Sequence, residues 1–232
     1  MVFSSKTFLM IATLCMMMGT QADVVPELLN GAAPTVANVK SSLAPPNDQQ
    51  LYDVFFAKGY RIYQCNPEKK RLEHWYNVQT HALLYPAKGR QAPFDIEGKA
   101  IGQMFAAPLN QTLQMADPDP EHQYIAAYYY PDGSWFSTGH PPTNTIHDED
   151  RKERGDEGVN LDDHLAEAAW TSTDGYFSHV EYAVRLHSLN GTHPAPNQCQ
   201  VKGVVVNQPF TAFYMLYTGP EGMKAIQNEI HL

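Results

Sequence analysis

Cysteine, positive charge and long apolar runs are all scarce in this sequence. It holds three cysteines and no Cys-x-x-Cys pair, the spacing typical of zinc sites. Lys and Arg total 16 against 25 Asp and Glu, so the formal net charge is -9, and the basic residues form no cluster. Contacts with nucleic-acid phosphates or anionic lipids require concentrated Lys and Arg. The composition therefore argues against nucleic acid as a partner.

The motifs of several enzyme classes are also missing. No Gly-x-Gly-x-x-Gly follows a strand pattern and no βαβ alternation is present, so the sequence gives no support to a nicotinamide-dependent dehydrogenase, and no cofactor is expected. Without a Gly-x-Ser-x-Gly elbow, acyl transfer by a nucleophilic serine is not expected either. Glycosidase chemistry needs two carboxylates placed across a sugar ring, and nothing in the sequence selects such a pair.

The N-terminal segment has the pattern of a signal peptide. Lys6 supplies a positive charge, residues 7–19 are apolar, and Thr20-Gln21-Ala22 ends the segment with small residues. The apolar run is shorter than the ~20 residues that span a bilayer, which argues against a membrane anchor. Over residues 1–22 we therefore predict a signal peptide that is cleaved after Ala22, leaving a secreted, extracellular protein with no membrane span.

The cysteines agree with export. Cys15 would leave with the signal peptide, so Cys65 and Cys199 remain. In an oxidising compartment two cysteines most simply form one disulfide. A Cys/His metal site is the alternative. Two sequons, at Asn110 and Asn190, would accept glycans if the source is a eukaryote.

Strand patterns dominate the chain after a loosely ordered, Pro-containing lead-in over 23–48. Residues 52–57 and 60–65 are β-rich runs on either side of Lys58-Gly59, which predicts a hairpin turn. The same pattern recurs where Pro131-Asp132-Gly133-Ser134 separates residues 124–130 from 135–138. Several hairpins in one chain predict an all-β fold: a single antiparallel β-sandwich or barrel-like domain, disulfide-tied, over 49–220.

Three later segments complete this domain. Tyr176–His187 alternates apolar and polar residues after the Asp174-Gly175 turn, which predicts one strand with a buried and a wet face. Phe210–Tyr217 is apolar on both faces, as in a central strand. Leu161–Trp170 mixes helix and strand signals, and its position before the turn favours a strand. The tail, 221–232, is expected to form a short surface helix.

Ordered short patches in the sequence resemble the secreted fungal and bacterial family catalogued as domain of unknown function 3455. The resemblance spans roughly residues 43–219 and implies a one-domain secreted β protein with the two cysteines at matching ends. It implies no activity, because the family has none established. The chain departs from the family where Leu161-Asp162-Asp163-His164 replaces an apolar Pro-Trp segment. The patches are Gly59-Tyr60-Arg61-Ile62-Tyr63-Gln64-Cys65, Trp75, Pro131-Asp132-Gly133-Ser134-Trp135, Gly175 to Leu186, Cys199 and Gln208-Pro209-Phe210-Thr211-Ala212-Phe213-Tyr214.

Metal binding has weak support. The His- and Asp-bearing stretch 140–150 and the stretch 117–122 carry ligand-type side chains without the spacing of a known site, which favours solvated loops. His179 and Glu181 share a face of the expected strand, but an ordinary wet sheet face explains them more simply than a metal site does. The sequence therefore predicts no metal site.

Aromatic residues are the more suggestive candidates for binding. Flat aromatic faces on β domains can stack on sugar rings, although core packing explains such residues too. The leading hypothesis is an extracellular or cell-wall-associated binding protein whose partner is a polysaccharide or another extracellular molecule. A secreted hydrolase or lyase using carboxylate and His chemistry, and a structural matrix protein, are the alternatives. The candidate ligand-binding residues are Trp75, Tyr128, Tyr130 and Trp135.

Overall fold

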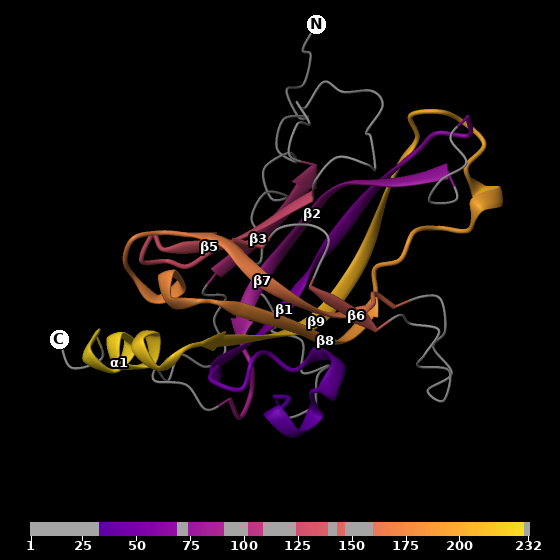
Figure 1. Cartoon of the computed structure of the whole chain (residues 1–232). Helices are drawn as coiled ribbons and strands as arrows, with labels where there is room; N and C mark the ends of the chain where they lie inside the picture. Colours follow the sequence, from indigo (N-terminus) through magenta and orange to yellow (C-terminus); the bar gives the residue numbers. More distant parts are fainter. Residues whose placement is uncertain are drawn as a thin grey trace, which may run out of the picture. The chain divides into compact units, whose positions relative to one another are not determined.

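The computed structural model shows an all-β antiparallel domain (Figure 1). The domain lies within the unit Gly31–Leu232 of the chain. The described residues are 33–68, 74–90, 102–108, 124–138, 143–146 and 160–229, all in this unit. The predicted signal peptide and Asn110 lie outside the described residues, so both remain predictions.

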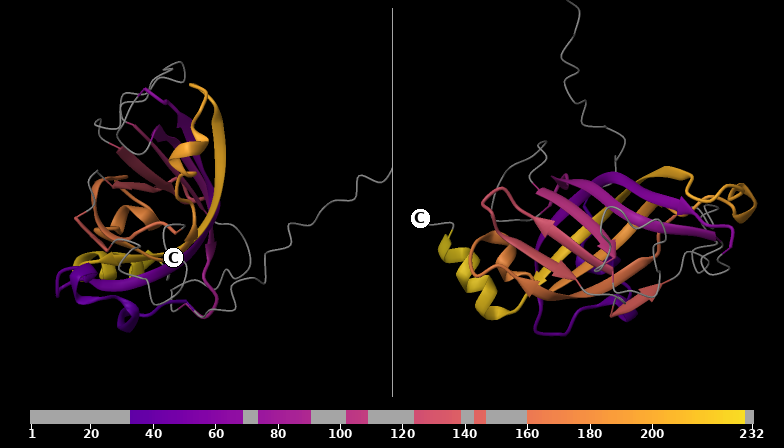
Figure 2. Two further views of the ribbon diagram at one scale, coloured as in Figure 1. Left: turned by 90° about the vertical axis from the view of Figure 1, so that its right-hand side faces the viewer. Right: turned by 90° about the horizontal axis from the view of Figure 1, so that it is seen from above.

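The strands form a closed barrel. In order across the sheet they are β5-β4-β3-β2-β1-β9-β8-β7-β6, and β5 also pairs with β7. That additional pairing closes eight strands into a ring, with β6 beside β7 (Figure 2). The barrel-like prediction fits, and the strands of the described residues do not divide into the two stacked sheets of a sandwich. The strands are β1 Gln50–Cys65, β2 Trp75–Pro86, β3 Gly102–Pro108, β4 Tyr124–Tyr129, β5 Trp135–Thr138, β6 Asn144–Ile146, β7 Asp163–Thr171, β8 Tyr182–Asn190 and β9 Val205–Thr218.

The predicted hairpin at Lys58-Gly59 is wrong, because β1 runs through it without a break. Gly59 lies opposite Ala82 of β2 and Phe210 of β9. A Cβ atom at Gly59 would lie 2.0 Å from the His81 carbonyl oxygen, so the glycine permits close approach of two backbones rather than a turn. The hairpin around Pro131–Ser134 is confirmed as the β4–β5 connection.

Both faces of the barrel wall bury apolar side chains. Phe55, Ala212 and Tyr214 belong to the inner cluster, while the alternating neighbours Val54 and Met215 belong to a second cluster on the outer face. The described part of the lead-in lies on that outer face. It forms two 3-10 turns, η1 (Val36–Asn38) and η2 (Ser41–Leu43), and its Leu43 is fully buried in the outer cluster.

The strand predicted over Tyr176–His187 divides into two elements. Its first residues form the 3-10 helix η5 (Tyr176–His179), whose Tyr176 and Phe177 join the inner cluster, and β8 starts only at Tyr182. The Asp132 carboxylate accepts from the Tyr176 N–H (2.8 Å), and the Ser134 hydroxyl accepts from the Phe177 N–H (2.8 Å). The β4–β5 turn therefore fixes the start of η5.

Gly175 allows this junction to form. Its φ is +88°, and a Cβ there would lie 2.6 Å from the Ser134 Cβ. The C-terminal helix α1 (Pro220–Glu229) also packs here, with Ile226 in the inner cluster beside Met223. Together η5 and α1 fill the end of the barrel at which β1 begins.

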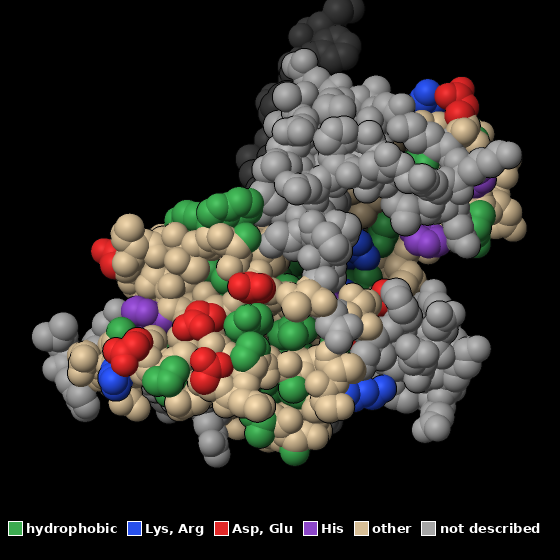
Figure 3. Space-filling model, in the orientation of Figure 1, with side chains coloured by type: hydrophobic (Ala, Val, Ile, Leu, Met, Phe, Trp, Pro, Cys, Tyr) green, Lys and Arg blue, Asp and Glu red, His purple; other side chains and the backbone are tan. Residues whose placement is uncertain are grey.

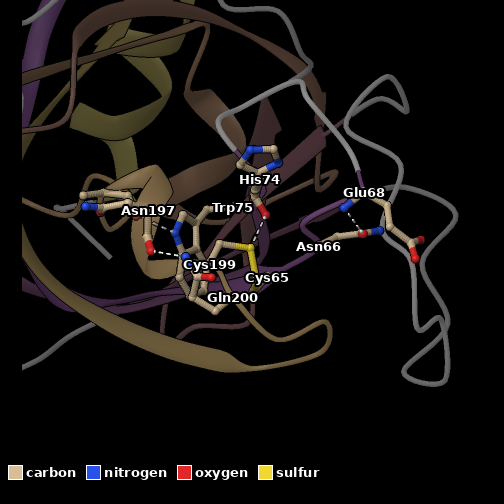
Figure 4. The surroundings of a disulfide bond; sticks show 9 residues. Cys65, Asn66, Glu68, His74, Trp75, Asn197, Cys199 and Gln200 are labelled. Carbon is tan, nitrogen blue, oxygen red and sulfur yellow. Dashed lines mark hydrogen bonds between the residues drawn. A yellow bond between two sulfur atoms is a disulfide. The ribbon is translucent and has the colours of Figure 1, made fainter.

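The disulfide lies at the other end of β1. Cys65 and Cys199 are bonded, with a sequence separation of 134, which confirms the predicted pairing (Figure 4). Tyr63 and Trp75 pack in the same cluster as the two cysteines. Closing a loop of this length stabilises a fold by about 5 kcal/mol in the chain-entropy model, before any loss to residual structure in the unfolded chain.

Candidate functional site

The four aromatic residues predicted to bind ligand lie in different environments. Trp75 is 2% exposed beside the disulfide, and its indole N–H donates to the Ala195 carbonyl (3.2 Å). Tyr128 is 2% exposed in the inner cluster, and its ring stacks on Phe136. Tyr130 packs against Tyr176 in the same cluster. Trp135 is half-buried on β5. Its neighbour Phe136 belongs to the inner cluster, so alternation places Trp135 on the outer face of the barrel.

Trp135 belongs to a band of rings on the outer wall, which we call the outer aromatic strip. Three of its rings are well exposed: Tyr60 at 54%, Tyr129 at 44% and Trp170 at 53%. Hydrophobic side chains also gather over the region of β3 and β5 in Figure 3. The strip consists of Tyr60 on β1, His81 on β2, Phe105 on β3, Tyr129 on β4, Trp135 on β5 and Trp170 on β7.

Strand register brings these rings together. Tyr60 lies opposite His81, and His81 lies opposite Phe105. The rings of His81 and Phe105 stack, with centroids 4.6 Å apart, and the Phe105 ring meets Tyr129 edge-on at 6.2 Å. Tyr129 in turn lies opposite Trp135. Directly opposite residues share a face, so the rings form a continuous row.

The inner wall carries a different group of side chains, which we call the lumen cluster. It consists of Arg61, Tyr63, Tyr128 and Arg185. The Tyr63 hydroxyl donates to the Gly191 carbonyl (2.8 Å), and the Arg61 guanidinium lies 5.2 Å from the centre of the Tyr63 ring. Arg185 donates twice to the Asp162 carbonyl, at 3.0 and 2.7 Å.

Electrostatic effects link the members of the lumen cluster. Burial raises the pKa of the Tyr63 phenol, while the charges of Arg61 and Arg185 act to lower it. Burial also raises the pKa of Tyr128 well above its ordinary value, and Arg185 again acts in the opposite direction. Both arginines therefore act on one phenol, and Arg185 acts on the second as well.

A third polar group lies at the end filled by η5. Arg90 and Asp53 form an ion pair (2.5 Å) whose side chains are 3% and 1% exposed. The Tyr176 hydroxyl donates to the second Asp53 oxygen (2.9 Å), and the Tyr52 ring packs on Tyr176. Burial raises the pKa of the Asp53 carboxyl, and Arg90 opposes that shift. With so little exposed surface, these groups hold the fold together rather than meet a ligand.

The candidate metal ligands do not converge in the described part of the chain. Within those residues no group of three or more His, Cys, Asp or Glu side chains could hold a metal ion. His179 lies on η5, whereas Glu181 follows it and accepts from the Gln49 side-chain amide (2.6 Å) and the Gly219 N–H (2.9 Å). The stretch 117–122 and most of 140–150 fall outside the described residues.

Two further predictions concern glycans and membranes. Asn190, at the end of β8, is exposed, and glycosylation there stays a prediction. None of the helices in the described residues has both the length and the hydrophobicity to cross a bilayer.

Sequence reasoning missed both the strip and the lumen cluster, for one reason. Tyr60, His81 and Phe105 come from separate strands and meet only through register, and so do Arg61 and Arg185. A signal was nevertheless present within one strand, because alternation places Tyr129 on the face opposite Tyr128. That alternation separates Tyr129 from the core.

Comparison with known proteins identifies a family and no individual relative. The chain has no match among the curated proteins or the solved structures compared with it. The family model described as "Protein of unknown function (DUF3455)" matches residues 45–218, which is most of the chain and includes every strand described above. The chain therefore belongs to the DUF3455 family.

Proposed function

We propose that this chain is an extracellular binding protein that holds polysaccharide on its outer aromatic strip. The observation that carries the proposal is the row of rings across β1 to β5, continued by Trp170 on β7, with Tyr60, Tyr129 and Trp170 about half exposed. Aromatic rings that stay exposed to water do not gain the free energy of burial. A row of them therefore marks a surface that a flat, partly apolar partner would cover. Sugar rings have such surfaces.

The acidic composition also limits which class of polymer can be the partner. A net charge of -9 disfavours nucleic acid and polyanionic polymers, so a neutral polysaccharide fits best. The strip follows the cross-strand direction, in which neighbouring strands are about 4.8 Å apart, so several rings can stack along one extended sugar chain. The predicted signal peptide agrees with a partner outside the cell.

The test is retention of the purified protein on insoluble cellulose, chitin, β-1,3-glucan, mannan and xylan. We expect at least one to retain the wild-type protein, and Tyr129→Ala and Trp170→Ala each to weaken that binding about two- to tenfold, the range expected for losing one aromatic contact. Leu189→Ala is the matched control, because Leu189 is 45% exposed but lies on β8, away from the strip.

Three results would count against the proposal. They are the absence of retention on every polysaccharide, equal weakening by Leu189→Ala, and release of soluble sugar products in the same assay. The last result would favour the hydrolase alternative.

A further inference from the structure

We propose that the barrel interior binds a small organic carboxylate through Arg61 and Arg185. This site lies on the inner wall and is separate from the outer aromatic strip, so it goes beyond polysaccharide binding and stands or falls independently of it. An eight-stranded barrel has an interior just wide enough for side chains to fill or for one small ligand to occupy. The side chains that line the interior decide what it can bind.

Register places Arg61 on the inner wall. Phe55, Ala57 and Gly59 precede it on the same face of β1, and the first two belong to the inner cluster. On β9 the residue opposite Arg61 is Gln208, two residues before the inner-cluster residue Phe210. A cation thus lies on a wall that is apolar at its other levels.

The wall around Arg61 is built from small side chains. Following the pairing from Arg61 through β2 to β5, the residues at the same level are Thr80, Ala106, Ala126 and Thr138. On this part of the inner wall the long Arg61 side chain is therefore surrounded by short ones. By contrast, the inner cluster near η5 contains large rings such as Phe55, Phe136 and Phe177.

Arg185 brings a second positive charge to the inner wall. It lies opposite Tyr214 of the inner cluster, and its charge acts on both Tyr63 and Tyr128. The two bonds to the Asp162 carbonyl fix its guanidinium but use only two of its five N–H groups.

The two guanidinium groups have no anionic partner in the described part of the chain. No carboxylate described there forms an ion pair with Arg61 or Arg185. Two like charges in a partly buried space repel each other, and an anion between them would relieve that repulsion. The planar guanidinium fork matches a carboxylate, and the neighbouring Ala106 and Ala126 provide an apolar wall for an organic body.

Isothermal titration calorimetry of the purified protein with benzoate, acetate and inorganic phosphate, at matched ionic strength in chloride, tests this site. We expect benzoate to bind most tightly, and Arg61→Gln to weaken its binding about tenfold or more, the loss of a charge-assisted hydrogen bond. Lys58→Gln removes the same charge from the exposed, outer face of the same strand, and it should change the affinity less than twofold.

Each other outcome would overturn the proposal. If benzoate did not bind, or if Arg61→Gln bound it as tightly as the wild-type protein while folded by circular dichroism, the arginines would not form a ligand site. Phosphate binding as tightly as benzoate would contradict an organic carboxylate. Equal loss in Lys58→Gln would reduce the effect to net charge. Retention on polysaccharide by Arg61→Gln would show that the outer strip functions separately.

Discussion

At the scale of single residues, the Asp53–Arg90 pair secures the end of the barrel that η5 fills. Asp53 accepts from Arg90, from the Tyr176 hydroxyl and from the Val54 N–H, so both carboxylate oxygens have partners. A buried ion pair is weak evidence of stability by itself, because both charges have lost their water. Removing Asp53 is costly, however, because the buried Arg90 charge loses the carboxylate that compensates it.

We therefore expect Asp53→Asn to lower the free energy of unfolding by about 3–5 kcal/mol, measured by urea denaturation. The matched control is Glu221→Gln, which breaks the exposed pair with Lys224, a pair whose side chains are 87% and 67% exposed. That change should stay within about 1 kcal/mol. Similar losses in the two variants would show that Asp53 is not held away from water.

Single residues also show where sequence reasoning stops. Asp132 and Gly133 were predictable as turn residues, since an Asp-Gly pair after proline favours a turn whatever surrounds it. Lys58-Gly59 also had the local sequence of a turn. In the structure, however, Gly59 lies inside β1, where its lack of a side chain lets Ala82, a residue far along the chain, come close. Local sequence cannot distinguish a glycine needed for its φ from one needed for the space it leaves.

At the scale of elements, the barrel is closed unevenly. β1 pairs with β9 from Gln50 to Gln64, whereas β5 pairs with β7 only from Phe136 to Thr138, with an irregularity inside that short span. The Ser172 side chain extends this junction, because its hydroxyl accepts from the Trp135 N–H (3.0 Å). A short ladder has few bonds to break, so local opening should begin there.

Hydrogen exchange can test this. Amides of the β5–β7 junction should exchange faster than those of the β1–β9 ladder under native conditions, and Ser172→Ala should accelerate exchange at the junction without changing the β1–β9 amides. Mass spectrometry of proteolytic fragments resolves the two regions. Uniform protection across both ladders would mean that the barrel opens only as a whole.

Alternation predicted the elements better than it predicted their surroundings. The face of β8 with Val184 and Leu186 was expected to be buried, and it is. It is buried on the outer face of the barrel, in the cluster that includes residues of the lead-in, while Arg185 faces the interior. In a barrel the polar face of a strand can point inwards, so polar does not mean wet. The strand over Leu161–Trp170 was predicted from its position before the turn, because its composition mixed helix and strand signals. The position of β9 between β1 and β8 followed from its apolar residues on both faces.

At the scale of the whole molecule, buried tyrosines make the stability of the fold depend on pH. Burial raises the pKa of phenols throughout the barrel: those of Tyr130 and Tyr217 rise to about 12, and those of Tyr52, Tyr128 and Tyr176 rise as well. The folded chain therefore keeps phenol protons that the unfolded chain loses near pH 10. This contribution to stability is complete below about pH 10 and is lost as the pH rises further.

We accordingly expect alkaline unfolding in which ionisation and loss of structure coincide. A spectrophotometric titration should show one portion of the tyrosinate absorbance appearing only when the circular dichroism of the strands disappears, whereas in concentrated denaturant all phenols should ionise near pH 10. The coincidence follows from burial, because a phenolate inside the barrel would lack both water and a partner. If every phenol ionised near pH 10 while the strands persisted, the barrel interior would have to be open to water, and the small side chains around Arg61 would then line a solvent-filled channel instead of a ligand site.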